Sequence, residues 1–176
     1  MITCRRLTAG EIDRALFAGF VRRQEVTRCW RKIDGEWQVR DVVFTDDWSE
    51  EDFAFLVACL RNTVHTGGAV FGAFEDGVLK GFASVEPGPL GKDGAYRDLS
   101  SLHVSQELRG RGIGRRLFKL AREFAREQGA QKLYISAHSA VETQAFYRAM
   151  GCTEAQEYDP AHAQKEPCDC QLECPV

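Results

Sequence analysis

The sequence lacks the features that mark several special classes of protein. It has no run of about 18 apolar residues, which excludes a membrane-spanning helix. Twenty-three basic and 26 acidic residues give a net charge of −3, which argues against a nucleic-acid binder that relies on overall positive charge. Charges interrupt the first 16 residues throughout, so we expect no secretory signal peptide and a cytoplasmic protein.

What is present is the composition of an ordinary globular protein. The chain has 176 residues, of which 44% are hydrophobic, 10% aromatic and 28% charged. Those values argue against disorder and against a collagen-like chain. The length is enough for one domain with a real core, and the sequence shows no repeat, low-complexity tract or linker that would divide it.

The seven cysteines are an unusually large set, and without a signal peptide we expect free thiols. Cys168, Cys170 and Cys174 are close enough in sequence for a metal site. However, no second pair with the usual zinc spacing supports that interpretation, so we expect no metal. The segment from residue 168 to residue 174 alternates cysteine or leucine with polar residues, which predicts one buried face of a strand.

The first half of the chain reads as a helix, a hairpin and a second helix. The first helix is expected to start near Thr8 and to bury Ile12, Leu16 and Phe20. A hairpin then turns at Asp34 and Gly35. The second helix is expected to begin at Ser49, with a capping box completed by Asp52, and to end at Gly67.

The second half alternates strands and helices. We expect strands at residues 69–74, 78–85, 98–104, 132–137, 153–158 and 168–174, a glycine- and proline-rich loop at 87–94, and helices starting at 113 and 141. The order predicts an α/β fold of the mixed α+β kind, with a central mixed sheet and helices on its faces.

The segment most informative about chemistry runs from residue 102 to residue 117. A strand leads into a loop with glycines at alternate positions, and the loop opens a helix. Glycines let the backbone turn its N–H groups toward a ligand, and the helix N-terminus adds partial positive charge. Residues 105–132 hold eight basic and three acidic side chains. This combination predicts a pyrophosphate site.

The glycine spacing discriminates between phosphate-binding motifs. A GxxxxGK[ST] loop is absent. The dinucleotide fingerprint needs GxGxxG and an acidic residue after the next strand, which here ends at His138 without one. The remaining match is RxxGxG, with Arg109 at its start and Gly112 and Gly114 at its glycine positions.

The segment 102–151 closely resembles the GNAT superfamily of acetyl-CoA-dependent N-acetyltransferases of the bacterial type. The matching features are the LxV strand end, the RxxGxG loop, the amphipathic helix, the next strand and an FYxxxG helix at residues 146–151. The N-terminal half matches only in element order, and we interpret the hairpin at about 27–40 as an insertion in one N-acetyltransferase domain spanning 1–176. The resemblance implies a mostly antiparallel mixed sheet whose strands splay apart where acetyl-CoA binds.

The resemblance also implies the residues that bind the cosubstrate. Leu102 and Val104 would offer backbone groups to pantetheine, and the Leu102 N–H would polarise the acetyl carbonyl. The loop and helix start would bind the pyrophosphate through Arg109, Gly110, Arg111, Gly112, Ile113, Gly114 and Arg115. An asparagine that often contacts pantetheine in the family is Ala140 here, and the adjacent Ser139 could replace it.

The candidate catalytic residues follow from the same resemblance. Tyr147 corresponds to the usual general acid, since a phenol near the sulfur can protonate a leaving thiolate. The general base is open between Asp98, at the position of a glutamate in several members, Glu86, and no dedicated base. His103 and His138 flank the expected groove, and each could equally be structural.

The expected reaction is direct attack of a primary amine on acetyl-CoA in a ternary complex. Six acidic residues against one lysine in 153–176 suggest a small cationic acceptor, with Glu157 and Asp159 near its opening. The alternatives are a non-catalytic acyl-CoA-binding module, an acetyltransferase that acts on protein amines, and a nucleotide-binding protein. We expect no nucleic-acid or membrane partner, and a homodimer stays open.

Overall fold

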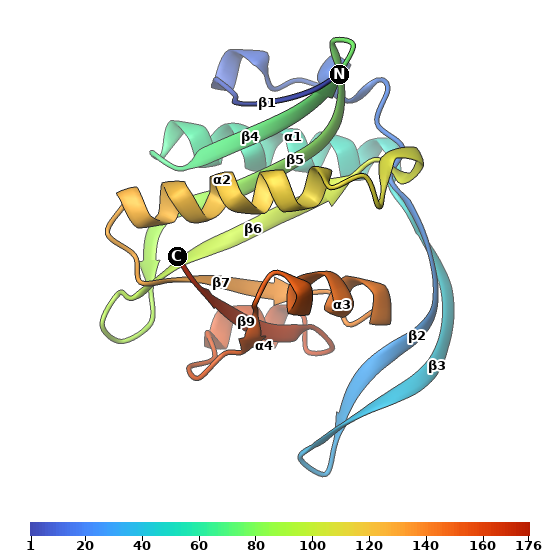
Figure 1. The fold of residues 1–176 in the computed structure, drawn as a ribbon, viewed down its shortest axis with the longest axis vertical. Coiled ribbons are helices and arrows are strands. Elements are labelled where there is room, and N and C mark those ends of the chain that lie inside the picture. The colour runs from blue at the N-terminus through green and yellow to red at the C-terminus, as the bar shows by residue number, and fades with distance from the viewer.

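The structure, a computed structural model, describes residues 1–176 and contains a seven-stranded sheet and a separate two-stranded sheet (Figure 1). The strand order in the large sheet is β1-β4-β5-β6-β7-β9-β8, and only β6 and β7 are parallel neighbours. Its strands are β1 (Ile2–Arg6), β4 (Ala69–Glu75), β5 (Val78–Leu90), β6 (Tyr96–Val104), β7 (Lys132–Ala137), β8 (Thr153–Glu154) and β9 (Cys170–Pro175). The predicted mixed, mostly antiparallel sheet is confirmed.

Helices cover both faces of this sheet. Helices α2 (Ile113–Glu127) and α3 (Val141–Ala149) lie on one face, and α1 (Glu50–His65) and the short α4 (Pro160–Lys165) lie on the other (Figure 1). The larger apolar cluster joins α2 to the sheet, with Leu117 and Ala121 fully buried. A second cluster joins α1 to the opposite face through Leu60 and Phe82. None of the helices has the length and apolar character that a membrane span requires.

The long helices begin where local sequence signals predict. At α1, the Ser49 side chain accepts a hydrogen bond from the Asp52 N–H, and the Asp52 carboxylate accepts one from the Ser49 N–H. This is the predicted capping box, which satisfies two of the helix's unpaired donors. Helix α2 begins after Gly112, as the spacing of its apolar residues predicts.

The predicted first helix is wrong. Residues 8–20 form two short 3₁₀ turns, Ala9–Glu11 and Ala15–Phe17, preceded by the unpredicted strand β1. The Asp13 carboxylate accepts a hydrogen bond from the Leu16 N–H, and this local bond starts a new turn in place of a continuous helix. Ile12, Phe17 and Phe20 are the buried residues, so burial does not follow the expected spacing.

The predicted hairpin is present but longer than 27–40. Its strands β2 (Arg23–Ile33) and β3 (Glu36–Asp47) form the two-stranded sheet, which projects past α3 (Figure 1). Asp34 and Gly35 both have positive φ at the turn, as a two-residue hairpin loop requires. The Trp30 N–H donates to the Ser139 carbonyl at 2.8 Å, which ties the hairpin to the end of β7.

The C-terminal segment differs from the prediction in two ways. The strand expected at 153–158 shortens to two residues, and α4 follows it. Cys168 is exposed, whereas Cys170 and Cys174 are buried as expected. Gln171 and Glu173 are buried as well, because residues of β6 and β7 bind their polar ends: Tyr134 donates to Gln171, and Tyr96 and Lys132 donate to Glu173.

Candidate active site

The parallel pairing of β6 with β7 stops early, and the two strands then diverge. Residues 96–98 pair with residues 132–134, and no pair follows Asp98 and Tyr134. A β-bulge lies just past this point, because Leu99 is opposite Val85 and Ser101 is opposite Ser84, which leaves Ser100 as an extra residue. The result is a fork between residues 99–104 and residues 135–138, as the resemblance implied.

The backbone of Leu102 and Val104 faces this fork. The Ser105 N–H donates to the Lys80 carbonyl at 2.8 Å, so positions 105, 103 and 101 exchange hydrogen bonds with β5. Alternation then turns the N–H and C=O groups of Leu102 and Val104 away from β5. The Val104 carbonyl accepts a hydrogen bond from Arg109 Nε at 3.2 Å. Apart from this carbonyl, the strand presents the backbone groups of Leu102 and Val104 to whatever occupies the fork.

The glycine-rich loop places the N-terminus of α2 at the mouth of the fork. Gly110 and Gly112 have φ of 78° and 79°, a left-handed conformation that side chains with a Cβ rarely adopt. Gly114 is needed for a different reason, since a Cβ there would lie 3.0 Å from the Phe146 ring. The first N–H groups of α2 have no partner within the helix, so the loop and helix start can receive an anion.

A cavity of about 760 Å³ occupies the fork. It is lined by most of the predicted cosubstrate residues: Leu102, Val104, Arg109, Gly110, Gly112, Ile113, Gly114 and Arg115. Arg111 is the exception, because its guanidinium pairs with Glu75 at 3.2 Å. The structure thus gathers eight of the nine around one cavity.

Tyr147 also lines the cavity, from α3. Only 6% of the residue is exposed, and its ring packs against Phe118 and Phe146. Burial raises the pKa of the phenol above its usual value of 10, because a phenolate would lose its hydration. The group therefore stays protonated at neutral pH, as a proton donor must.

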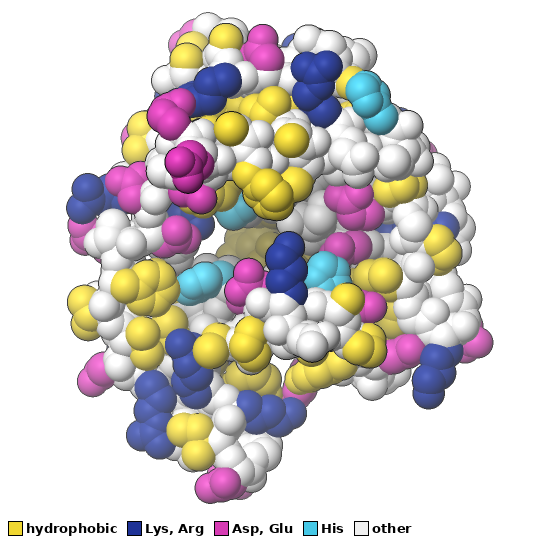
Figure 2. Space-filling view, turned by 180° about the vertical axis from the view of Figure 1, so that it is seen from behind, with side chains coloured by type: hydrophobic (Ala, Val, Ile, Leu, Met, Phe, Trp, Pro, Cys, Tyr) yellow, Lys and Arg dark blue, Asp and Glu magenta, His cyan; other side chains and the backbone are white.

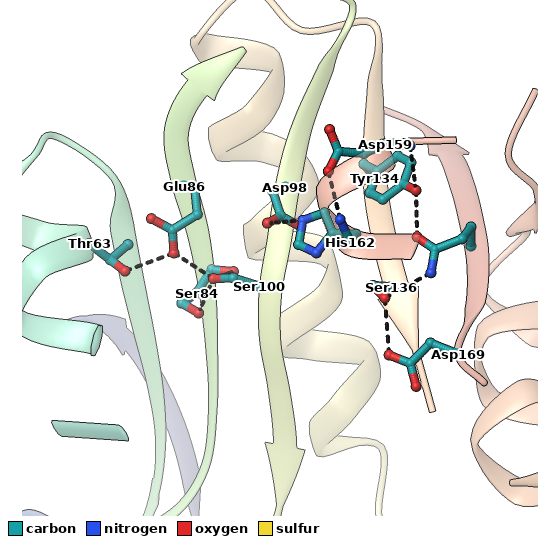
Figure 3. Close-up of polar contacts among 11 residues, drawn as sticks. Thr63, Ser84, Glu86, Asp98, Ser100, Tyr134, Ser136, Asp159, His162 and Asp169 are labelled. Atoms are coloured by element: carbon teal, nitrogen blue, oxygen red, sulfur yellow. Dashed lines mark hydrogen bonds and ion pairs between the residues drawn. The ribbon is translucent and has the colours of Figure 1, made fainter. Parts of the chain in front are cut away.

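The two candidate bases lie on the face opposite α2, and neither reaches the cavity directly (Figure 3). Asp98 is 7% exposed and receives a 2.8 Å contact from His162 Nε2 on α4. Glu86 accepts hydrogen bonds from Ser100 at 2.6 Å and from Thr63 at 2.8 Å. Ser100 lines the cavity, whereas neither carboxylate does.

A third carboxylate, Asp169, lies behind a serine of β7 in the same way that Glu86 lies behind Ser100 of β6. Ser136 of β7 lines the cavity and donates to Asp169 at 3.0 Å. Burial raises the pKa of Asp169, although the bond from Ser136 opposes the shift. Figure 2 views this face of the molecule and shows a hollow with acidic and histidine side chains beside it.

His103 and His138, which were expected to flank the groove, both line the cavity. The His103 ring packs against Trp48 and Phe82, and burial together with Arg22 and Arg109 lowers its pKa to about 3. His103 is therefore neutral at physiological pH. His138 Nδ1 accepts a hydrogen bond from the Ala140 N–H at 3.1 Å, which fixes the ring at the end of β7.

Three residues that were expected to contact the substrates do not line the fork cavity: Glu157, Asp159 and Ser139. Glu157 accepts a hydrogen bond from the Lys92 N–H, and Asp159 caps α4 by accepting from the His162 N–H. Both line a separate cavity of about 290 Å³ and not the fork. Ser139, expected to replace the family's asparagine, is buried outside the cavity and accepts a hydrogen bond from Arg31.

One wall of the cavity was not predicted from the sequence. Arg22, Gln24 and Glu25, at the base of the hairpin, line it although they lie about 80 residues from the fork in sequence. Arg22 is buried, pairs with Asp46 at 2.7 Å and lies 5.0 Å above the Trp48 ring. The other unforeseen residues with ionisable or hydroxyl groups are Ser100, Ser101, Ser136, Glu142 and Thr143.

The family model described as "Acetyltransferase (GNAT) family" matches residues 24–152, which is well over half of the chain. The chain belongs to the GNAT acetyltransferase family. As a member it is an acyltransferase of the N-acetyltransferase class, and the resemblance noted for residues 102–151 extends through the hairpin. Among curated protein sequences, none matches this GNAT chain significantly.

Solved structures of similar fold support the family assignment. A nourseothricin acetyltransferase is 21% identical, with 99% of this chain and 98% of that chain covered and a TM-score of 0.67. A protein from Bacillus anthracis str. Ames, assigned as a streptothricin acetyltransferase and solved with acetyl coenzyme A, is 15% identical, with 100% and 99% covered and a TM-score of 0.75. The PaiA N-acetyltransferase of Thermoplasma acidophilum, solved with coenzyme A, is 15% identical, with 100% and 99% covered and a TM-score of 0.61. At these identities the likeness concerns the fold.

Proposed function

We propose that this GNAT protein moves the acetyl group of acetyl-CoA to the nitrogen of a primary amine, by direct attack while both substrates are bound. The observation that carries the proposal is the fork, in which Leu102 and Val104 turn backbone groups toward a cavity beside the open N-terminus of α2. An extended pantetheine chain adds to such a strand edge, and a pyrophosphate suits the helix N-terminus.

The proposed chemistry needs two groups around the thioester. As the amine attacks, negative charge develops on the acetyl oxygen, and the Leu102 N–H stabilises it. The carbon–sulfur bond then breaks, and Tyr147 protonates the departing thiolate. The phenol is suited to this role because burial keeps it protonated and it lines the same cavity.

The proposed acceptor is a small cationic amine. The carboxylates of Glu86 and Asp169 stand behind Ser100 and Ser136, on the two arms of the fork and opposite the basic loop that would hold the cosubstrate. This arrangement attracts a cation from one face and an anion from the other. Two of the similar structures are named for acetylation of nourseothricin and streptothricin, which makes antibiotics of that class natural compounds to test.

A panel of amines tests the proposal, with release of the coenzyme A thiol and the mass of the acetylated product as readouts. The panel includes a streptothricin, linear polyamines, lysine, glutamate and a lysine-containing peptide, and a reaction without acceptor measures background hydrolysis. We expect turnover of at least one small cationic amine well above background. Binding of acetyl-CoA without turnover of any amine would contradict the proposal and favour a non-catalytic acyl-CoA-binding module.

A further inference from the structure

Buried Asp98 and half-buried His162 form a pair at the point where β6 and β7 begin to diverge. Asp98 is the last residue of β6 that pairs with β7, and its Oδ2 lies 2.8 Å from His162 Nε2 (Figure 3). The other carboxylate oxygen, Oδ1, is buried without a partner. The His162 side chain is 28% exposed against 10% for Asp98, so the histidine ring stands between the carboxylate and solvent.

The hydrogen bond fixes the tautomer of the ring. An ionised carboxylate can only accept, so Nε2 of a neutral His162 carries the proton and donates it to Asp98. The structure gives the remaining ring nitrogen, Nδ1, no partner within the chain. The ring therefore presents an unpaired lone pair, which is the form of histidine that accepts a proton.

Two further contacts hold the ring in this orientation. It stacks on Tyr134, with ring centroids 5.5 Å apart and planes at 21°. Asp159 caps α4 by accepting from the His162 N–H at 3.0 Å, and the Asp159 N–H donates to the Tyr134 hydroxyl at 2.9 Å. Tyr134 directly precedes Ile135 and Ser136, which line the cavity, so the held ring lies at the point where the strands separate. The ring stands behind the cavity lining and is not itself part of it.

We propose that His162 is the proton acceptor of the acetyl transfer and that Asp98 is the residue that positions it. The inference rests on the function proposed above. The acceptor amine arrives as an ammonium ion and gives one proton to a water molecule, which passes one of its own protons to Nδ1 behind the cavity lining. The lone pair freed on the amine then attacks the acetyl carbon. The imidazolium that forms is stabilised by the Asp98 carboxylate, and its proton passes to solvent after the product leaves.

The charged groups around His162 favour the cationic form that this step creates. Asp98 on β6 raises the pKa of the ring through its hydrogen bond, and Asp159 adds to the shift, whereas burial and Lys165 oppose it. Asp169, ahead of β9, is close enough to interact with the ring electrostatically. Tyr134 of β7, which stacks on the ring, adds no charge next to it.

Steady-state kinetics of His162→Gln and Asp98→Asn test the proposal, using the best amine of the panel. His65→Gln, at the exposed end of α1, and Asp93→Asn, in the exposed loop before β6, are matched controls. We expect His162→Gln to lower kcat about 10²–10⁴-fold with the KM for acetyl-CoA unchanged. Asp98→Asn, which keeps the shape of the side chain, should lower kcat as well and lower the pH at which activity rises. In His162→Gln that rise should instead follow the amine itself, toward pH of about 10.

If His162 and Asp98 only stabilise the fold, these measurements give different results. Loss of stability with an unchanged pH profile per folded enzyme, or wild-type kcat in His162→Gln, would overturn the proposal. An NMR titration of the His162 ring in wild-type and Asp98→Asn protein provides a readout that does not depend on the acceptor. Equal ring pKa values in the two proteins would also overturn it. If the wild-type enzyme turns over an amine and His162→Gln does so with the same kcat, only this inference fails. If the wild-type enzyme turns over no amine, both the proposed function and this inference fail.

Discussion

Asp98 and Tyr134 are the last residues at which β6 and β7 run side by side, and the cavity begins at the next residue of each strand. The divergence is possible because the bulge at Ser100 changes the direction of β6 while β5 still supports its other edge. The same pair of positions holds the Asp98–His162 contact and the Tyr134 ring beneath it. The binding cavity and the proposed proton acceptor therefore share one structural origin.

Replacing Tyr147 with phenylalanine tests the general acid. The ring would keep its contacts with Phe118 and Phe146, so we expect an unchanged fold and little change in the KM for acetyl-CoA. Loss of the proton donor should lower kcat about 10²–10⁴-fold. Steady-state kinetics with thiol release measure both constants. A kcat equal to that of the wild-type enzyme would give Tyr147 a packing role only.

Reversing one charge at the start of α2 tests the pyrophosphate site. Glutamate at Gly112 or Gly114 would be a poor test, because the first position has positive φ and a Cβ at the second meets Phe146. Arg115 is exposed and lines the cavity, so Arg115→Glu should weaken acetyl-CoA binding at least about tenfold by calorimetry while the protein stays folded. Arg126→Glu, at the far end of the same helix, is the control and should bind normally. Equal affinities in the two variants would contradict the assignment.

Salt dependence tests the electrostatic account of the acceptor. For a cationic amine, we expect the acceptor KM to rise with ionic strength, because screening weakens its attraction to Glu86 and Asp169. The double variant Glu86→Gln, Asp169→Asn should have a higher KM and a weaker salt response. Glu157→Gln, at the separate cavity, should behave as wild type. A flat salt response in the wild-type enzyme would leave the carboxylates without this role.

His103 predicts a loss of stability in acid. Its pKa is about 3 in the folded protein and near 6.5 when unfolded, so below pH 6.5 the unfolded chain binds a proton that the folded chain excludes. Between pH 6.5 and about 3, this residue lowers the free energy of unfolding by up to about 1.4 kcal/mol for each pH unit. Thermal melts at pH of about 7.5 and 5.5 should show a smaller decrease in Tm for His103→Gln than for the wild type. The same decrease in both proteins would contradict the shift.

Local signals account for what the sequence could predict. The Ser49 capping box, the apolar spacing of α2 and the turn at Asp34 and Gly35 depend on neighbouring residues, and each is present in the structure. The glycine loop is equally local, so most of its predicted residues line the cavity. The helix predicted after Thr8 failed because one local bond to Asp13 competes with helix continuation.

The unforeseen parts of the site depend on contacts between distant segments. His162 reaches Asp98 across 64 positions of the chain, and Asp169 reaches Ser136 across 33. The hairpin base reaches the cavity only after the tertiary fold forms. A histidine in a short acidic segment has no periodic pattern around it, so nothing in the sequence marked His162 as a partner of Asp98.

Amide hydrogen exchange followed by NMR, with and without acetyl-CoA, tests whether the fork holds the cosubstrate. We expect acetyl-CoA to slow exchange at the Leu102 and Val104 N–H groups and at residues 110–115, because these amides face the fork and the loop. Amides of the hairpin tip around Asp34 should exchange at unchanged rates. If acetyl-CoA is bound but Leu102 and the loop gain no protection, the fork does not hold the cosubstrate.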